Sequence, residues 1–283
     1  MRNKLILSIA SLAAAVSLTA CGASGSGSTS SSAAADGSSS GGITVVKVGA
    51  NPVPHAKILE FIDQNLAQKN GIDLDIKEFD DYQTPNVALS EGSIDANYYM
   101  HEPFFNDQVK TKGYKFEHGA GVHIEPYAAF SSKYKQVSEI PDGATIGITN
   151  DPGNQPRALK MLESAGLLKD IKDDSAALTL TDAQNPKKLK FEENQPEILV
   201  QVAKDPKIDL AIINGNYILQ AGMSTKDALI VESTENNPYA NFLAWRAGEE
   251  TPGIKKLDEL LHSPEVKKYI EDTWPSGDVI PAK

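Results

Sequence analysis

The chain has 283 residues, of which 40% are hydrophobic, an ordinary proportion for a protein that buries a sizeable core. Its formal net charge is −11, and no run of lysine or arginine interrupts the acidic balance, which argues against a nucleic-acid partner. The single cysteine, Cys21, excludes an internal disulfide.

The first 20 residues have the form of a secretory signal peptide. Arg2 and Lys4 precede an apolar run at 5–16, which is too short for an ordinary membrane span. An uncleaved anchoring helix is the alternative. We predict that residues 1–20 are removed, which leaves 25 basic and 38 acidic residues and a charge of −13.

The next segment predicts a lipid anchor and a tether. The sequence "LTAC" at 18–21 resembles the lipobox of bacterial lipoproteins, in which the cysteine is acylated; a buried free thiol is the alternative for Cys21. Two or more acyl chains, at about 0.8 kcal/mol per buried methylene, would hold the protein on a membrane. Residues 22–42 are almost all Gly, Ser and Ala, which favours a flexible tether. Residues 21–42 are thus predicted to be a lipidated cysteine and its tether.

The folded part begins with alternating strands and helices. Residues 43–50 are β-branched and apolar and predict a strand, and residues 51–70 predict a helix that ends at Gly71. Residues 72–80 alternate as a second strand, and 86–92 form a short helix. This order is typical of βαβ units and a mostly parallel sheet.

The same order restarts at a strand over 144–151. The later predicted elements are helices at 156–168 and 196–205, strands at 208–215, 228–233 and 241–246, and two helices within 251–274 that break at Ser263 and Pro264. Two units of similar size indicate two lobes with a cleft between them, and ligands of such sheets bind where strands end. We assign residues 43–126 with about 232–283 to lobe 1, and 127–231 to lobe 2.

The segment "NDPGNQPRAL" at 150–159 predicts an anion site. Asn154 can cap a helix, with Pro156 in the first turn. Arg157 then lies in that turn, where the helix dipole disfavours a cation. A bound carboxylate would be stabilised by both the helix N-terminus and the guanidinium. A surface salt bridge is the alternative.

The segment "IDANYYMHEPFFNDQ" at 94–108 is rich in aromatic residues. Tyr98 and Tyr99 are adjacent, so in a strand they face opposite sides, and we expect only one to be inward. Aromatic residues are usually core, but rings beside a thioether such as Met100 also suit a binding pocket. Tyr82 could add another wall.

The histidines show no spacing typical of zinc, and we predict no metal or other cofactor. They are His55, His101, His118, His123 and His262. No GxSxG elbow or paired-carboxylate motif appears, and His101 has no evident nucleophile beside it. A tethered hydrolase that uses His101 and a metal-binding lipoprotein stay open as alternatives.

Five segments, in order, resemble the methionine-binding lipoproteins of ABC importers. They are "VGANPVPHAKIL", "NVALSEGSIDANYYMHEPFF", "PDGATIGITNDPGNQPRAL", "IDLAIINGNY" and "NPYANFLAWR". With the lipobox the resemblance covers essentially the whole chain. It implies a two-lobed α/β substrate-binding-protein fold with the ligand in the interlobe cleft. It also implies no enzymatic activity, a lipid-anchored extracytoplasmic location, and delivery of a free amino acid to an ABC importer permease.

The resemblance also implies the ligand contacts. Tyr82, Tyr99, His101 and Phe104 would line the side-chain pocket, Arg157 with Asn154 would bind the α-carboxylate, and Asn214 and Asn241 would hold the polar head. No acidic residue in these clusters is an obvious partner for the ammonium, so the two asparagine oxygens are expected to accept from it. The family commonly has Phe at Tyr99, Gln at Met100 and Tyr at Phe104. The resemblance makes methionine the leading ligand, and these three differences in the pocket leave other amino acids or a short methionine peptide as alternatives.

Overall fold

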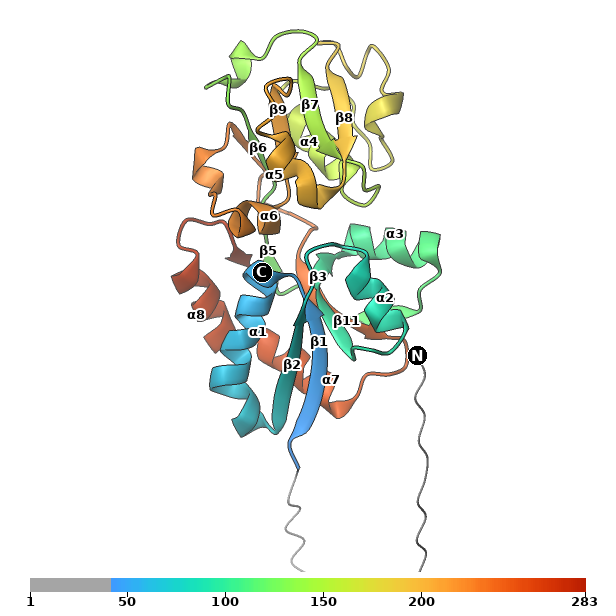
Figure 1. Cartoon of the computed structure of the whole chain (residues 1–283), viewed down its shortest axis with the longest axis vertical. Coiled ribbons are helices and arrows are strands. Elements are labelled where there is room, and N and C mark those ends of the chain that lie inside the picture. The colour runs from blue at the N-terminus through green and yellow to red at the C-terminus, as the bar shows by residue number, and fades with distance from the viewer. Residues whose placement is uncertain (1–41) are drawn as a thin grey trace, which may run out of the picture. The chain divides into compact units, whose positions relative to one another are not determined.

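The computed structural model in Figure 1 describes residues 42–283. The signal peptide, Cys21 and all but the last residue of the predicted tether lie outside the described residues. Within 42–283, no helix is long and apolar enough to cross a membrane.

The first sheet is built around two parallel pairs. Its strands are β1 Thr44–Ala50, β2 Ile72–Glu78, β3 Ala96–His101, β4 Phe116–His118, β5 His123–Ile124, β11 Asn241–Arg246 and β12 Ile280–Pro281. The order is β12-β5-β11-β3-β1-β2, and β4 also pairs with β11. Strand β1 is parallel to β2 and β3, whereas β11 is antiparallel to β3, β4 and β5.

Helices cover both faces of this sheet (Figure 1). One face is packed by α1 Lys57–Ile62, α7 Pro252–Leu261 and α8 Pro264–Thr273, whose Ile58, Leu257 and Val266 share a core with β1. The other face is packed by α2 Thr84–Ser90 and α3 Glu102–Lys112. Helix α1 lies inside a longer helical stretch, with turns at Pro52–Ala56, Asp63–Ala67 and Gln68–Asn70.

Local signals place the ends of these helices. The helical stretch ends at Gly71, whose φ of 76° is left-handed, as the sequence predicts. The two C-terminal helices break at Ser263, whose side chain accepts a hydrogen bond from the backbone N–H of Val266 and so caps α8.

The second sheet has the order β10-β6-β9-β7-β8. Its strands are β6 Ala128–Phe130, β7 Thr145–Thr149, β8 Lys190–Asn194, β9 Leu210–Ile213 and β10 Ile230–Val231. Its helices are α4 Gln155–Ser164, α5 Leu199–Val202 and α6 Gly215–Gln220, with single 3₁₀ turns at Val137–Glu139, Ala177–Thr179, Pro196–Ile198 and Thr225–Asp227. Leu210 and Ile212 pack with α4, while Ala211 and Ile213 face α5 and α6.

The predicted α/β fold with helices flanking two sheets is confirmed, but both sheets are mixed rather than mostly parallel. In the second sheet β7 is parallel to β8 and β9, whereas β6 is antiparallel to β9 and to β10. The antiparallel pairs arise where the chain passes between the sheets, because β6 follows β5 into the second sheet and β11 returns to the first.

Both tyrosines of the aromatic segment are buried, so the expectation of one inward ring was wrong. Tyr98 is 0% exposed and packs with α1, while Tyr99 is 4% exposed and packs with α2 and α3. They do face opposite sides, but the sheet is covered on both. The cluster around Tyr99 continues to Ile213 and Tyr217, so one apolar core joins elements of the two sheets.

Candidate functional site

One cavity brings together all eight ligand contacts expected from the sequence. Its empty volume, including space open to solvent, is about 330 Å³. Its lining consists of Tyr82, Tyr99, Met100, His101, Phe104, Glu125, Tyr127, Asn154, Arg157, Asn214, Gly215, Asn216 and Asn241. That these residues bind a ligand stays a prediction.

Three aromatic rings form one side of the cavity. The ring of Tyr82 lies 5.9 Å from that of Tyr99 and 5.8 Å from that of Phe104, between centroids. The Tyr99 hydroxyl donates to the backbone oxygen of Tyr82 at 2.8 Å. The phenol at position 99 is therefore tied to the backbone.

Both ring nitrogens of His101 are used in hydrogen bonds. His101 stands at the N-terminus of α3, where Nδ1 accepts from the backbone N–H of Phe104 at 3.3 Å. Nε2 must then carry the hydrogen, which it donates to Oδ1 of Asn154 at 2.8 Å. Burial, with the charge of Arg157, lowers the pKa of His101 to about 3. The ring is neutral and has no free nitrogen for proton abstraction, so the geometry gives the hydrolase alternative no support.

Asn154 lies at the start of α4, but its side chain makes no capping hydrogen bond, so that expectation was wrong. Its Nδ2 instead donates to Asp151, and its Oδ1 accepts from His101 and from the Tyr127 hydroxyl at 2.7 Å. The Asp151 carboxylate, which also accepts from the backbone N–H of Gly153 at 2.8 Å, fixes which way the Asn154 amide points. Burial raises the pKa of Asp151 to about 6.

Arg157 is buried and already paired. Its Nε and Nη2 donate to the two carboxylate oxygens of Glu232 at 2.7 and 2.6 Å, and Nη2 also donates to the backbone oxygen of Glu125 at 2.8 Å. The guanidinium carbon lies 3.9 and 4.2 Å from the ring centres of Tyr127 and Tyr239. Arg157 does form a salt bridge, but the pair is buried, so the alternative of a surface salt bridge was wrong. Nη1 makes no hydrogen bond to any residue from 42 to 283.

Two buried asparagine atoms at the cavity wall have no partner within 42–283. They are Oδ1 of Asn214, an acceptor, and Nδ2 of Asn216, a donor. Oδ1 of Asn216 accepts from the Tyr82 hydroxyl at 2.5 Å. A polar ligand group or a water molecule between these side chains would satisfy both atoms.

Sequence reasoning missed Glu125, Tyr127 and Asn216. The first two lie in the segment that joins β5 to β6, which has neither periodicity nor a motif. Asn216 lies two residues after Asn214, in the polar segment after β9, and its position there was the one available signal.

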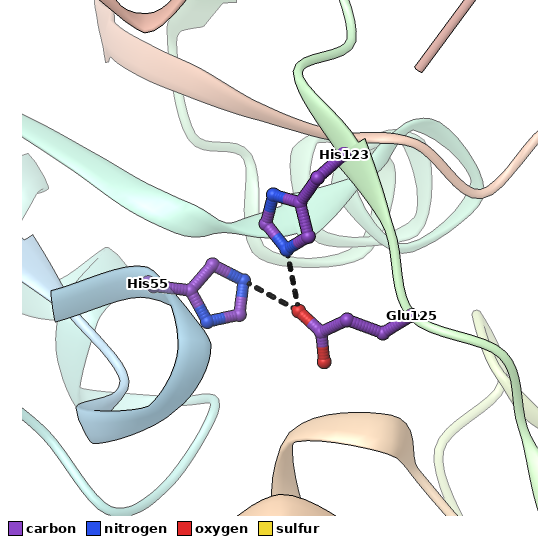
Figure 2. Close-up of side chains that lie close together, drawn as sticks. All are labelled: His55, His123 and Glu125. Atoms are coloured by element: carbon purple, nitrogen blue, oxygen red, sulfur yellow. Dashed lines mark hydrogen bonds and ion pairs between the residues drawn. The ribbon is translucent and has the colours of Figure 1, made fainter. Parts of the chain in front are cut away.

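Glu125 is also part of a buried cluster with His55 and His123 (Figure 2). Oε1 of Glu125 lies 3.0 Å from Nε2 of His55 and 2.8 Å from Nε2 of His123. These ligand atoms are close enough together to hold a metal ion. The spacing test applied to the sequence could not find this cluster, because its two histidines come from distant segments.

The chain matches the family model described as NlpA lipoprotein over residues 46–283. It is 39% identical to the methionine-binding lipoprotein MetQ of Bacillus subtilis (strain 168) over 284 residues, which is 99% of this chain and 98% of that protein. Two solved structures are also similar. A nutrient-binding protein from Burkholderia cenocepacia bound to methionine has a TM-score of 0.78 and 36% identity, covering 84% of this chain and 100% of that one. A periplasmic substrate-binding protein of an ABC transporter from Coxiella burnetii has a TM-score of 0.77 and 36% identity, with the same coverage.

Proposed function

The chain belongs to the NlpA lipoprotein family, and from this we propose that it is an extracytoplasmic substrate-binding lipoprotein that captures free methionine and delivers it to an ABC importer. Acylated Cys21 anchors it to the bacterial cell membrane, and the segment up to residue 42 is the tether. Lobe 1 comprises residues 43–126 with about 232–283, and lobe 2 comprises 127–231. Relatives named for methionine binding and for ABC transport support the proposed role in capture and import.

The division of the cavity into an aromatic and a polar side is the observation that carries the proposal. The rings of Tyr82, Tyr99 and Phe104 would contact the thioether side chain, at about 0.3–1.5 kcal/mol for a sulfur–aromatic contact. Arg157 would bind the α-carboxylate through Nη1, and Asn154 would hold His101 and Tyr127 in place. Asn214 and Asn241 complete the polar side.

Binding rather than catalysis suits this chemistry. His101 has both nitrogens engaged, and no serine, threonine or cysteine is among the residues that line the cavity. Acyl transfer would need a nucleophile with a base beside it. Capture and release of an unchanged amino acid needs neither.

A melting-temperature panel of L- and D-amino acids tests the proposal. The protein would start at residue 21 with Cys21→Ser, and it would be unfolded and refolded first to strip retained ligand. A ligand that binds only the folded state stabilises it by about 2.7 kcal/mol at a hundredfold excess over its dissociation constant. We expect a rise with methionine. A rise with another amino acid alone would move the substrate, and no rise with any would contradict the proposal.

A further inference from the structure

Glu125 reaches the cavity from the segment between β5 and β6, and its two carboxylate oxygens have different surroundings. Oε1 lies between the rings of His55 and His123, at 3.0 and 2.8 Å from their Nε2 atoms. Oε2 points away from both rings (Figure 2) and accepts no hydrogen bond within the described part of the chain. One of the two oxygens of this buried carboxylate, Oε2, therefore has no hydrogen-bond donor among residues 42–283.

The hydrogen bonds of the two rings indicate that they act as donors to Glu125. The Tyr98 hydroxyl contacts Nδ1 of His123, so this nitrogen can accept and Nε2 can carry the hydrogen. Nδ1 of His55 is buried and has no partner among residues 42–283. A metal ion would need a bare Nε2 on His55, which would put the hydrogen on Nδ1 and leave a buried donor unpaired. If Nε2 of His55 instead carries the hydrogen and donates to Glu125, Nδ1 is left with an unpaired lone pair and no unpaired donor. The cluster therefore favours a hydrogen-bonded carboxylate over a metal site.

Within residues 42–283, no lysine or arginine side chain pairs with the Glu125 carboxylate, whose side-chain partners are His55 and His123. Burial opposes its ionisation, but His55 and His123 outweigh burial, and the pKa of Glu125 lies below its ordinary value. Arg157, the one guanidinium among the described residues that line the cavity, is paired with Glu232 through two hydrogen bonds. An ionised carboxylate in such a place is costly unless a cation joins it.

We infer that Glu125 accepts the ammonium group of the ligand through Oε2, so that the site selects free α-amino acids by both of their charged groups. This inference rests on the proposed function and deepens it. Arg157 donates to the backbone oxygen of Glu125 at 2.8 Å, so the cation and the anion of the wall are neighbours. The ammonium and carboxylate of an α-amino acid share one carbon and are also neighbours. Oδ1 of Asn214, buried and unpartnered within the described residues, is a second acceptor for the same ammonium.

The test compares L-methionine with 4-(methylsulfanyl)butanoate, which lacks only the amine, by titration calorimetry. The protein is the chain from residue 21 with Cys21→Ser, with or without Glu125→Gln. Glutamine keeps the size and one acceptor for the two rings but loses the charge. We expect the unsubstituted site to prefer methionine by about 30-fold or more, as for a buried charge pair, and Glu125→Gln to lose most of that preference. The affinity for the butanoate should not fall, because the substitution removes a negative charge near its carboxylate. Glu91→Gln, on an exposed residue without a side-chain partner within 42–283, is the matched control.

Each other result has one meaning. Equal affinity of the unsubstituted protein for the two compounds would overturn the inference without any variant, even if Glu125→Gln fails to fold. An equal loss of both ligands in Glu125→Gln would also overturn it, because it would show a structural role only. A melting temperature raised by zinc chloride, but not after Glu125→Gln, would assign the cluster to a metal instead. If the unsubstituted protein binds neither compound, the proposed function itself fails, and the inference with it.

Discussion

Replacing Arg157 by alanine should remove ligand binding and also weaken the fold. The side chain has an observed and a proposed role, because its Nε and Nη2 bind Glu232 while Nη1 is proposed to bind the ligand. The variant would leave the Glu232 carboxylate, whose side chain is only 11% exposed, without its partner. It would also remove the guanidinium from between Tyr127 and Tyr239.

The loss of stability can be estimated from these contacts. Breaking a buried ion pair on one side costs about 3–5 kcal/mol, and the slight exposure of Glu232 places this pair toward the lower end. Removing Glu232 as well should restore part of the loss, because the unpaired buried charge is then gone. Lys160→Ala on the same helix is the matched control. Its pair with Asp173 is at the surface, where such pairs contribute about 0–1 kcal/mol.

Urea unfolding and methionine titration of the single, double and control variants would check both effects. Arg157→Ala should unfold at a lower urea concentration than Lys160→Ala, and the double variant should lie between them. Neither variant without Arg157 should bind methionine. An Arg157→Ala protein as stable as the control would refute the energetic argument, and methionine binding by the double variant would refute the carboxylate clamp.

Three further perturbations follow from the structure. The pKa of Asp151 is raised from its ordinary value of 3.8 to about 6 in the folded protein. Asp151 therefore stabilises the fold fully at a pH below 3.8, and this contribution is lost as the pH rises through 6. Relative to Asp151→Asn, the unsubstituted protein should therefore lose up to roughly 3 kcal/mol between pH 4 and 7, and parallel stability curves would contradict this. Gly153→Ala would put a Cβ 2.7 Å from the Cα of Phe104, so it should lower the free energy of unfolding by about 1–3 kcal/mol and weaken methionine binding in titration calorimetry. Gly42→Ala is the control, because its Cβ would have nothing within 4 Å and should leave both unchanged. Cys21→Ser should release the protein from the membrane fraction of cells, and unchanged retention would argue against lipid attachment.

The sequence by itself determined the elements and the neighbourhood of the site. The apolar periodicity of residues 51–70 and the glycine after them predict a helix and its end, because both depend on neighbours within a few residues. Polar and aromatic segments that follow predicted strands also predict that their side chains meet. Tyr82, His101, Arg157 and Asn214 do line one cavity, because strand ends of this kind converge at sheet edges.

Only the tertiary structure decided what each side chain does there. The local sequence allows Asn154 to cap α4, but its side-chain amide forms hydrogen bonds with Asp151, His101 and Tyr127 instead. Arg157 meets Glu232, 75 residues away, and Glu125 meets His55, from a distant helical turn. No local pattern records such pairs, because hydrogen bonds and charges act over a few ångströms in space whatever the separation along the chain. The partners of a buried polar group are therefore known only once the chain has folded.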